Sequence, residues 1–295
     1  MKESSNLKRF RIMGIVFLVL LGGLIVYRVI KEGVVSSQLG INLAVVGENG
    51  CSLLVLRPDE DIVGWVNLPE KLKLKIYNSS AQYPIGSLWV YGVSEKRPYE
   101  ILEKSLGLSV GVAISRTIKI NGDPSVEGVL GSLHKINLKT DLSLRDRFLI
   151  RRYLVEAVSS KKILEMDIPK KAMDKITEPD GKDFLIFNNV MVLWTKNKFL
   201  LESILMENVD ASINNLSGIV GLGVAVSRQL ESAGLRVVEV KTDPNQGIAG
   251  TGCIFVSRGN YPVTESFLIQ QMKCERRVEV DKGMINKGGV GIWLK

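Results

Sequence analysis

Residues 209–240 read VDASINNLSGIVGLGVAVSRQLESAGLRVVEV, and this stretch decides the fold class. Residues 209–214 are strand-like, and a loop leads into a helix from about residue 220 to Ala233, which Gly234 ends. The apolar stripe of that helix consists of Leu222, Ala225, Val226 and Leu230. A second strand follows at 235–240, and a right-handed crossover makes the two strands parallel. The sequence therefore predicts an α/β protein of mixed (α+β) character.

The chain after residue 240 extends this unit. Residues 253–257 predict a third strand, 265–272 a second amphipathic helix and 291–294 a last strand. Together, residues 207–295 predict a small β-α-β C-terminal domain. Gly218, Gly221 and Gly223 follow a G-x-x-G-x-G spacing, which is not the dinucleotide fingerprint, so we do not expect a nucleotide site.

The chain before residue 207 predicts a mixed-sheet middle domain at 38–206. Its expected strands are 41–46, 51–56, 62–68, 72–76, 110–114, 184–187 and 190–194. Its expected helices are 98–106, ended by Gly107, and 144–162, which follows a Ser143 cap. On the second helix, the predicted apolar face consists of Leu144, Phe148, Leu154 or Val155, and Val158. Residues 115–140 give no clear pattern.

The N-terminal part contains the most apolar segment, IMGIVFLVLLGGLIVYRVI at 12–30. Its uncharged stretch spans ~24 Å as a helix, and Arg28 can reach the lipid interface. Four basic residues precede it, so residues 1–11 are expected to be a cytoplasmic tail and 12–30 a single transmembrane helix. A cleaved signal peptide and a buried core helix are the alternatives. We expect a single-pass cell-membrane protein whose C-terminal domains are extracytoplasmic.

Charge and cysteine content exclude several classes of protein. The net charge is +8, but six of the basic residues lie within 1–31, so the charge indicates membrane topology and we expect no nucleic acid partner. Cys51, Cys253 and Cys274 are too widely spaced for a zinc site, and His134 is the single histidine. Buried free thiols and a Cys253–Cys274 disulfide both remain open.

Four arginines form the candidate anion-binding site. They lie on the predicted helix 144–162 and are Arg145, Arg147, Arg151 and Arg152. A solvated helix face is one explanation. A phosphate-binding cluster is the other, because the guanidinium fork suits phosphate oxygens.

The C-terminal stretch resembles the LytR C-terminal domain. The resemblance lies in residues 212–218 (SINNLSG), 220–223 (VGLG), Leu230 and 234–237. That domain reads as a strand, a Gly-Leu-Ala helix start and a helix that closes in Gly before a second strand. Leu216 replaces its usual Thr and Gly223 its usual Ala. The resemblance implies a cell-envelope protein.

The middle of the chain resembles, more distantly, the LytR-CpsA-Psr catalytic domain. Residues 41–46 look like its first strand, 53–66 like the following hairpin and Leu68-Pro69 like its Ile-Pro-Arg-Asp element. In that family the Arg and nearby acidic residues bind a pyrophosphate and its metal. The family transfers a glycopolymer from polyprenyl pyrophosphate to peptidoglycan. Here Glu70 stands at the Arg position and Lys71 at the Asp position.

Other positions match in part. Glu48 falls near the expected acidic position and is the weak candidate for a metal ligand. Arg151 matches the Arg of an Arg-Gln pair, Arg152 replaces the Gln, and Phe148 replaces a preceding Arg. Exchanging an Arg for Glu at a pyrophosphate clamp replaces attraction with repulsion, and losing one such donor costs about 10²–10³-fold in rate.

The resemblance and its departures imply a non-catalytic binding or scaffolding relative without a cofactor. An active phosphotransferase that uses the four arginines, Glu48 and Mg²⁺ is the first alternative, and an envelope sensor or regulator is the second. Expected partners are the lipid bilayer through residues 12–30, cell-wall glycopolymer, polyprenyl pyrophosphate lipid and other envelope proteins.

Overall fold

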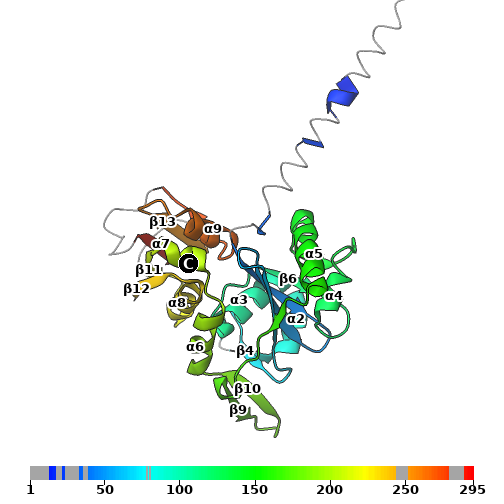
Figure 1. Ribbon diagram of the computed structural model, residues 1–295. Coiled ribbons are helices and arrows are strands. Elements are labelled where there is room, and N and C mark those ends of the chain that lie inside the picture. The colour runs from blue at the N-terminus through cyan, green and yellow to red at the C-terminus, as the bar shows by residue number, and fades with distance from the viewer. Residues whose placement is uncertain are drawn as a thin grey trace, which may run out of the picture.

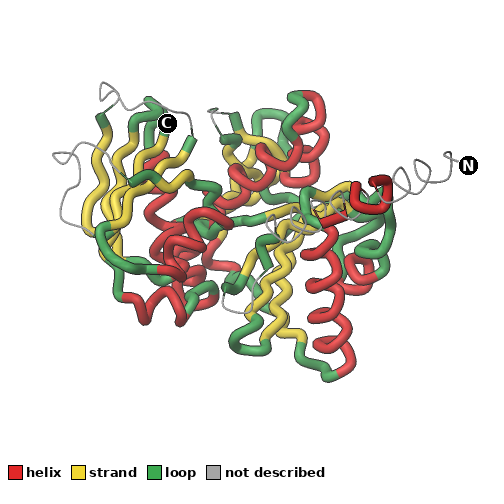
Figure 2. The backbone as a smooth tube through the Cα atoms, turned by 90° about the horizontal axis from the view of Figure 1, so that it is seen from above, coloured by secondary structure: helices red, strands yellow, loops and turns green. Residues whose placement is uncertain are grey.

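The computed structural model describes residues 13–17, 22–23, 33–35, 39–77, 79, 81–243, 252–278 and 289–295. It confirms a mixed α/β protein, with one large mixed sheet in the middle of the chain and a second near the C-terminus (Figure 1). Figure 2 shows helices lying between the C-terminal sheet and the rest of the molecule.

The larger sheet has six strands in the order β7-β6-β1-β2-β3-β8. Their bounds are β1 Ile41–Val46, β2 Cys51–Arg57, β3 Ile62–Asn67, β6 Arg116–Lys119, β7 Lys139–Thr140 and β8 Ile163–Glu165. β1, β2 and β3 are antiparallel neighbours, whereas β6 and β8 pair in parallel with β1 and β3. Every residue of β1 and β2 is buried, because helices cover both faces of the sheet.

Two groups of helices cover these faces. α2 (Ile85–Ser94) and α3 (Pro98–Val110) pack with the core on one face, and α4 (Val126–Leu130) and α5 (Leu144–Ser159) with the core on the other. The remaining elements before the C-terminal part are β4 Lys73–Lys75, β5 Gln82–Pro84, the 3-10 turn η1 Lys170–Ala172, β9 Met173–Thr177, β10 Asp183–Phe187, α6 Asn189–Lys198 and α7 Glu202–Glu207.

The C-terminal sheet has five strands in the order β12-β11-β15-β13-β14. Their bounds are β11 Asp210–Asn215, β12 Arg236–Thr242, β13 Cys253–Ser257, β14 Glu275–Arg276 and β15 Val290–Leu294, with helices α8 Leu222–Ala233 and α9 Pro262–Gln270. β11 and β12 are parallel, as the β-α-β pattern predicts, and Gly234 ends α8 in the left-handed conformation at φ 114°. The core of this sheet also includes Leu201 and Ile204, which precede the boundary predicted at 206/207.

Three local predictions for the middle domain are wrong. α3 does not stop at Gly107 but continues to Val110 and ends at Gly111, and the strand expected at 110–114 does not form. Residues 190–194 belong to α6 rather than to a strand, because the Asn188 side chain accepts a hydrogen bond from the Val190 N–H at 3.0 Å and so caps a helix. A short apolar run does not distinguish a buried helix from a strand by itself.

The predicted orientation of the apolar face of α5 is also wrong. Leu144, Phe148, Val155 and Val158 do share one side of the helix, but that side is exposed. The side that packs against the core carries Leu154, which the sequence offered as the alternative to Val155, together with Ile150 and Ala157.

Most of the predicted transmembrane segment lies outside the described residues. Of residues 12–30, only 13–17 and 22–23 are described, and both pieces are helical and exposed. Within the parts of the chain that the structure describes, no helix reaches the length and apolar character that crossing a membrane requires.

Candidate functional site

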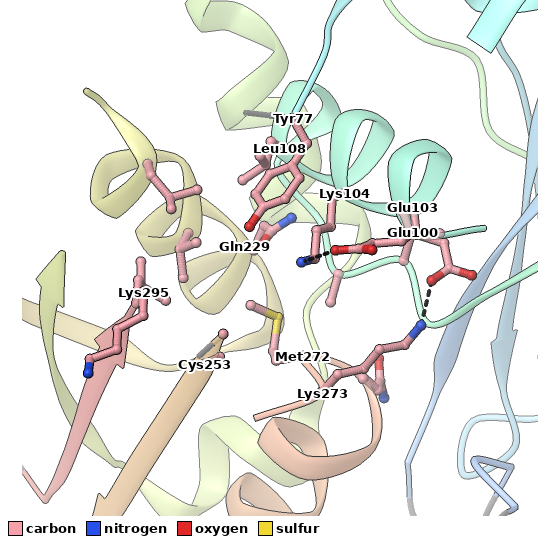
Figure 3. Close-up of a pocket in the computed structure, with 17 residues that line it drawn as sticks. Tyr77, Glu100, Glu103, Lys104, Leu108, Gln229, Cys253, Met272, Lys273 and Lys295 are labelled. Atoms are coloured by element: carbon pink, nitrogen blue, oxygen red, sulfur yellow. Dashed lines mark hydrogen bonds and ion pairs between the residues drawn. The ribbon is translucent and has the colours of Figure 1, made fainter. Parts of the chain in front are cut away.

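A cavity of about 400 Å³ lies between the middle and C-terminal parts of the chain, and we call it the interdomain cavity. α3, α8, the ends of β13 and β15, and the segment after α9 form its walls (Figure 3). Its lining is Tyr77, Glu100, Glu103, Lys104, Leu108, Ala113, Ile114, Leu222, Val226, Gln229, Gly252, Cys253, Gln271, Met272, Lys273, Leu294 and Lys295.

The close approach of α3 and α8 depends on Gly107. A β-carbon at this position would lie 2.7 Å from Gln229 Nε2 and 2.9 Å from the Val112 carbonyl oxygen. The same Gln229 Nε2 donates to that carbonyl at 3.2 Å, which ties α8 to the end of α3. Gly107 therefore serves helix packing rather than helix termination, since only a residue without a side chain fits between the two helices.

One wall of the cavity carries a buried carboxylate, Glu103, which is only 4% exposed. Lys273 Nζ lies 2.6 Å from Glu103 Oε2, and the Thr117 hydroxyl donates to Oε1 at 3.1 Å. Lys273 also lies 3.7 Å from Asp141, which pairs with Arg116 at 3.5 Å. Burial, and to a smaller extent the nearby Asp141, raise the pKa of Glu103 to about 8, and Lys273 opposes the rise.

A second ion pair lies beside the first on α3 (Figure 3). Lys104 Nζ bonds Glu100 Oε1 at 2.8 Å and lies 4.2 Å from the centre of the Tyr77 ring. This hydrogen bond from Lys104 lowers the pKa of Glu100. With Lys295, the cavity carries three ammonium groups against two carboxylates. Lys104 and Lys273 are both paired with these carboxylates, so the side chains of the lining carry one positive charge in excess.

The segment that carries Lys273 is fixed at both ends. Cys253 of β13 and Cys274 form a disulfide, which decides between the two alternatives that the sequence leaves open for this pair. Gln271 Nε2 donates to the Gly40 carbonyl oxygen at 2.5 Å and so attaches the same segment to the middle part of the chain. Cys51 is a free, buried thiol, and burial raises its pKa to about 12.

The arginines predicted from the sequence do not line this cavity. Arg147 is buried, and its guanidinium donates to the Leu133 carbonyl oxygen at 2.9 and 2.7 Å and to the Lys135 carbonyl oxygen. Arg145, Arg151 and Arg152 are exposed on α5. The structure therefore separates Arg147, which holds the loop before α5, from the other three.

Glu48, the candidate metal ligand, lies in the exposed turn between β1 and β2. Its N–H donates to the Gly122 carbonyl oxygen at 2.8 Å. Among the described residues, no group of three His, Cys, Asp or Glu side chains is arranged to hold a metal ion. Glu70 and Lys71, at the positions where the resembling family has Arg and Asp, are exposed and follow β3.

Comparisons with known proteins give only distant similarities. No family model and no curated protein sequence matches the chain. A transcriptional regulator of Enterococcus faecalis matches in structure with a TM-score of 0.42 and 11% identity, over 55% of this chain and 87% of that one. B. subtilis TagT gives 0.40 and 10% over 55% and 92%, and B. subtilis TagV 0.40 and 7% over 52% and 93%. At these values the likeness carries no argument about activity.

Proposed function

We propose that the chain is a membrane-anchored extracytoplasmic envelope protein that binds an amphipathic anion in the interdomain cavity without catalysing a reaction. The cavity itself carries this proposal. At about 400 Å³ it falls within the roughly 300–1,000 Å³ range of small-molecule sites. Leu108, Val226 and Met272 supply apolar surface for a hydrocarbon chain, and Lys104 and Lys273 supply positive charge for an anionic group.

Two further features support the envelope location. The apolar residues 12–30 follow a basic stretch, which is the pattern of an uncleaved signal anchor with a cytoplasmic N-terminus. The Cys253–Cys274 disulfide is a feature of oxidising compartments outside the cytoplasm. The resemblance of residues 212–237 to the LytR C-terminal domain supports the same location.

The chain lacks residues that the family it resembles uses to bind pyrophosphate, and this supports the proposal that it is not catalytic. Glu70 and Lys71 replace an Arg and an Asp of its pyrophosphate site, and Arg147 already donates to the buried Leu133 carbonyl oxygen and to the Lys135 carbonyl oxygen. A guanidinium that satisfies carbonyl groups in the fold is not available as a clamp for a transition state.

The alternative function is a phosphotransferase that moves glycopolymers from polyprenyl pyrophosphate to peptidoglycan. The exposure of Arg151 and Arg152 on α5 favours it, because these side chains can reach a phosphate in solution. In that case Glu48 and Mg²⁺ would complete the site.

Binding of farnesyl pyrophosphate, a short isoprenoid anion, distinguishes the two functions. The full chain is held in lipid nanodiscs, and binding is measured by titration calorimetry. We expect saturable binding that Val226→Phe weakens at least tenfold by filling the cavity, while Arg151→Ala leaves it unchanged. Binding that Arg151→Ala abolishes and Val226→Phe leaves intact would reject the cavity and favour the phosphotransferase.

A further inference from the structure

α5 presents an exposed apolar stripe to the outside of the molecule. Leu144 and Phe148 are 68% and 67% exposed, and Val155 and Val158 are 44% and 39% exposed. At about 100° per residue, these four side chains lie on one face of the helix. Arg151 falls in the middle of the same face. We call these five residues the α5 stripe.

Within the described part of the chain, nothing covers the apolar side chains of the α5 stripe. The helix packs against the core of the larger sheet through its other side, where Ile150 and Leu154 are fully buried. A contiguous row of large exposed apolar side chains marks an interaction surface on a soluble domain. Since α5 packs against the core through Ile150 and Leu154, the stripe remains available for contact with a partner outside the described chain.

The path of the chain identifies what lies next to this surface. The Asp146 carboxylate, in the first turn of α5, accepts hydrogen bonds from the N–H groups of Val34 and Val35 at 3.0–3.1 Å. Both valines are 2% exposed, and the Ser143 hydroxyl donates to the same carboxylate at 2.9 Å. The polypeptide that follows the apolar residues 12–30 is therefore fixed to the N-terminal end of α5.

The length of the connection limits how far α5 can lie from the end of that apolar segment. Three residues lie between Ile30 and Val34, and a fully extended chain spans at most about 14 Å over the four steps that join them. If residues 12–30 cross a bilayer, Val34 cannot be farther than this from the end of the span, and the beginning of α5 lies one Asp146 side chain beyond Val34.

The charges on α5 match an anionic lipid surface. Arg151 lies within the stripe and Arg152 beside it, and Glu156 is the one exposed acidic residue of the helix. A helix face that combines apolar and basic side chains is typical of segments that lie in the membrane interface. Arginine also forms paired hydrogen bonds with phosphate oxygens, so it suits phospholipid headgroups.

We propose that the α5 stripe rests on the surface of a phospholipid bilayer rich in anionic headgroups, next to the membrane anchor. This inference rests on the proposed function, because the anchor is what brings α5 to the bilayer. α5 lies at one edge of the molecule and the C-terminal sheet at the other (Figure 1), so the two do not compete for the same surface. The anchor attaches the chain to the bilayer, and the contact of α5 would in addition fix the orientation of the interdomain cavity relative to the lipid.

Tryptophan quenching by brominated acyl chains tests the contact in the full chain. The four native tryptophans, Trp65, Trp89, Trp194 and Trp293, are all 8% exposed or less, so their emission gives a constant background. Phe148→Trp places a new fluorophore in the stripe. Leu193→Trp is the matched control, because Leu193 is 64% exposed but lies on α6.

Both variants are incorporated into nanodiscs of phosphatidylcholine and phosphatidylglycerol, with or without bromine on the acyl chains. We expect bromine to reduce the added emission of Phe148→Trp at least twofold and to leave that of Leu193→Trp unchanged. Replacing Arg151 and Arg152 by Gln in the Phe148→Trp chain should remove most of the quenching. Discs of phosphatidylcholine alone should show less quenching than the anionic discs.

The outcomes separate this inference from the proposed function. A chain that does not co-elute with nanodiscs would reject both the anchor and the contact of α5. A chain that co-elutes but shows equal emission of Phe148→Trp with and without bromine would reject the contact alone. An emission of Phe148→Trp that depends on protein concentration but not on bromine would assign the stripe to a second copy of the chain and would also overturn the inference.

Discussion

Replacing Glu103 by Gln should remove a large part of the pH dependence of folding stability. Glu103 lies in the wall of the interdomain cavity, where burial raises its pKa from 4.5 to about 8. Between these two pH values the folded state holds a proton that the unfolded state has released. Its contribution to stability is therefore fully present below pH 4.5 and is lost as the pH rises through about 8.

The size of this effect follows from the pKa. At ~1.4 kcal/mol for each pH unit, the loss is on the order of 5 kcal/mol across the window. The Lys273 ammonium and Thr117 hydroxyl next to Glu103 partly stabilise its charged form, and Asp141 disfavours it. Gln has nearly the shape of protonated Glu and does not ionise. We therefore expect Glu103→Gln to match the wild type near pH 5 and to exceed its stability near pH 8.5.

The assay is urea unfolding of the full chain in nanodiscs, followed by tryptophan fluorescence from pH 5 to 8.5. Glu100→Gln is the matched control, because Glu100 lies one turn away on α3 and Lys104 lowers its pKa. A lowered pKa acts below pH 4.5, so this control should follow the wild-type profile within the tested range. Parallel profiles for the wild type and Glu103→Gln would show that the carboxyl group does not hold a proton in the folded state.

Three further predictions concern stability. Arg147→Ala should lower the free energy of unfolding by about 2–4 kcal/mol, because it leaves the buried Leu133 carbonyl oxygen without its donors and removes a buried side chain. Arg151→Ala should change it by less than ~0.5 kcal/mol. Urea titration compares the two variants, and equal losses would contradict their different roles. Replacing Cys253 and Cys274 by Ala should cost about 3 kcal/mol, since the disulfide joins positions 21 residues apart, and an unchanged melting temperature would argue against the bond. Asp146→Asn should weaken the two N–H bonds that hold residues 34–35 and accelerate proteolysis there, without a comparable change at sites in β12; equal rates would refute this role.

The sequence predicts the central elements of both sheets because their signals are local. β1 and β2 are continuous apolar runs bounded by turn residues, and the β-α-β unit at 209–240 ends its helix at a glycine that takes a positive φ. These signals depend on neighbouring residues and do not require knowledge of tertiary contacts.

The orientation of α5 could not be predicted in the same way. The spacing of Leu144, Phe148, Val155 and Val158 shows that they share a face, but spacing does not reveal whether that face meets the core or the outside. The core side is recognisable only in the fold, where Ile150 and Leu154 pack against the sheet.

The interdomain cavity was missed for a related reason. Its walls come from α3, α8 and residues 271–273, which are far apart in the sequence and meet only when the two sheets are placed. Two features of the cavity walls are visible in the sequence: Gly107, which the sequence predicts as a helix end, and the Cys253–Cys274 pair. Neither signal says by itself that a cavity lies between them.

The most direct test of the central claim is to map where an amphipathic anion binds. A farnesyl pyrophosphate analogue with a photoreactive diazirine on its isoprenoid chain is irradiated with the full chain in nanodiscs, and the labelled peptides are identified by mass spectrometry. Binding in the interdomain cavity predicts labels on the peptides that contain Leu108, Val226 and Met272, which excess unlabelled farnesyl pyrophosphate suppresses. Labels confined to the peptides of α5 around Arg151 would contradict that claim and would move the binding site to the arginine helix.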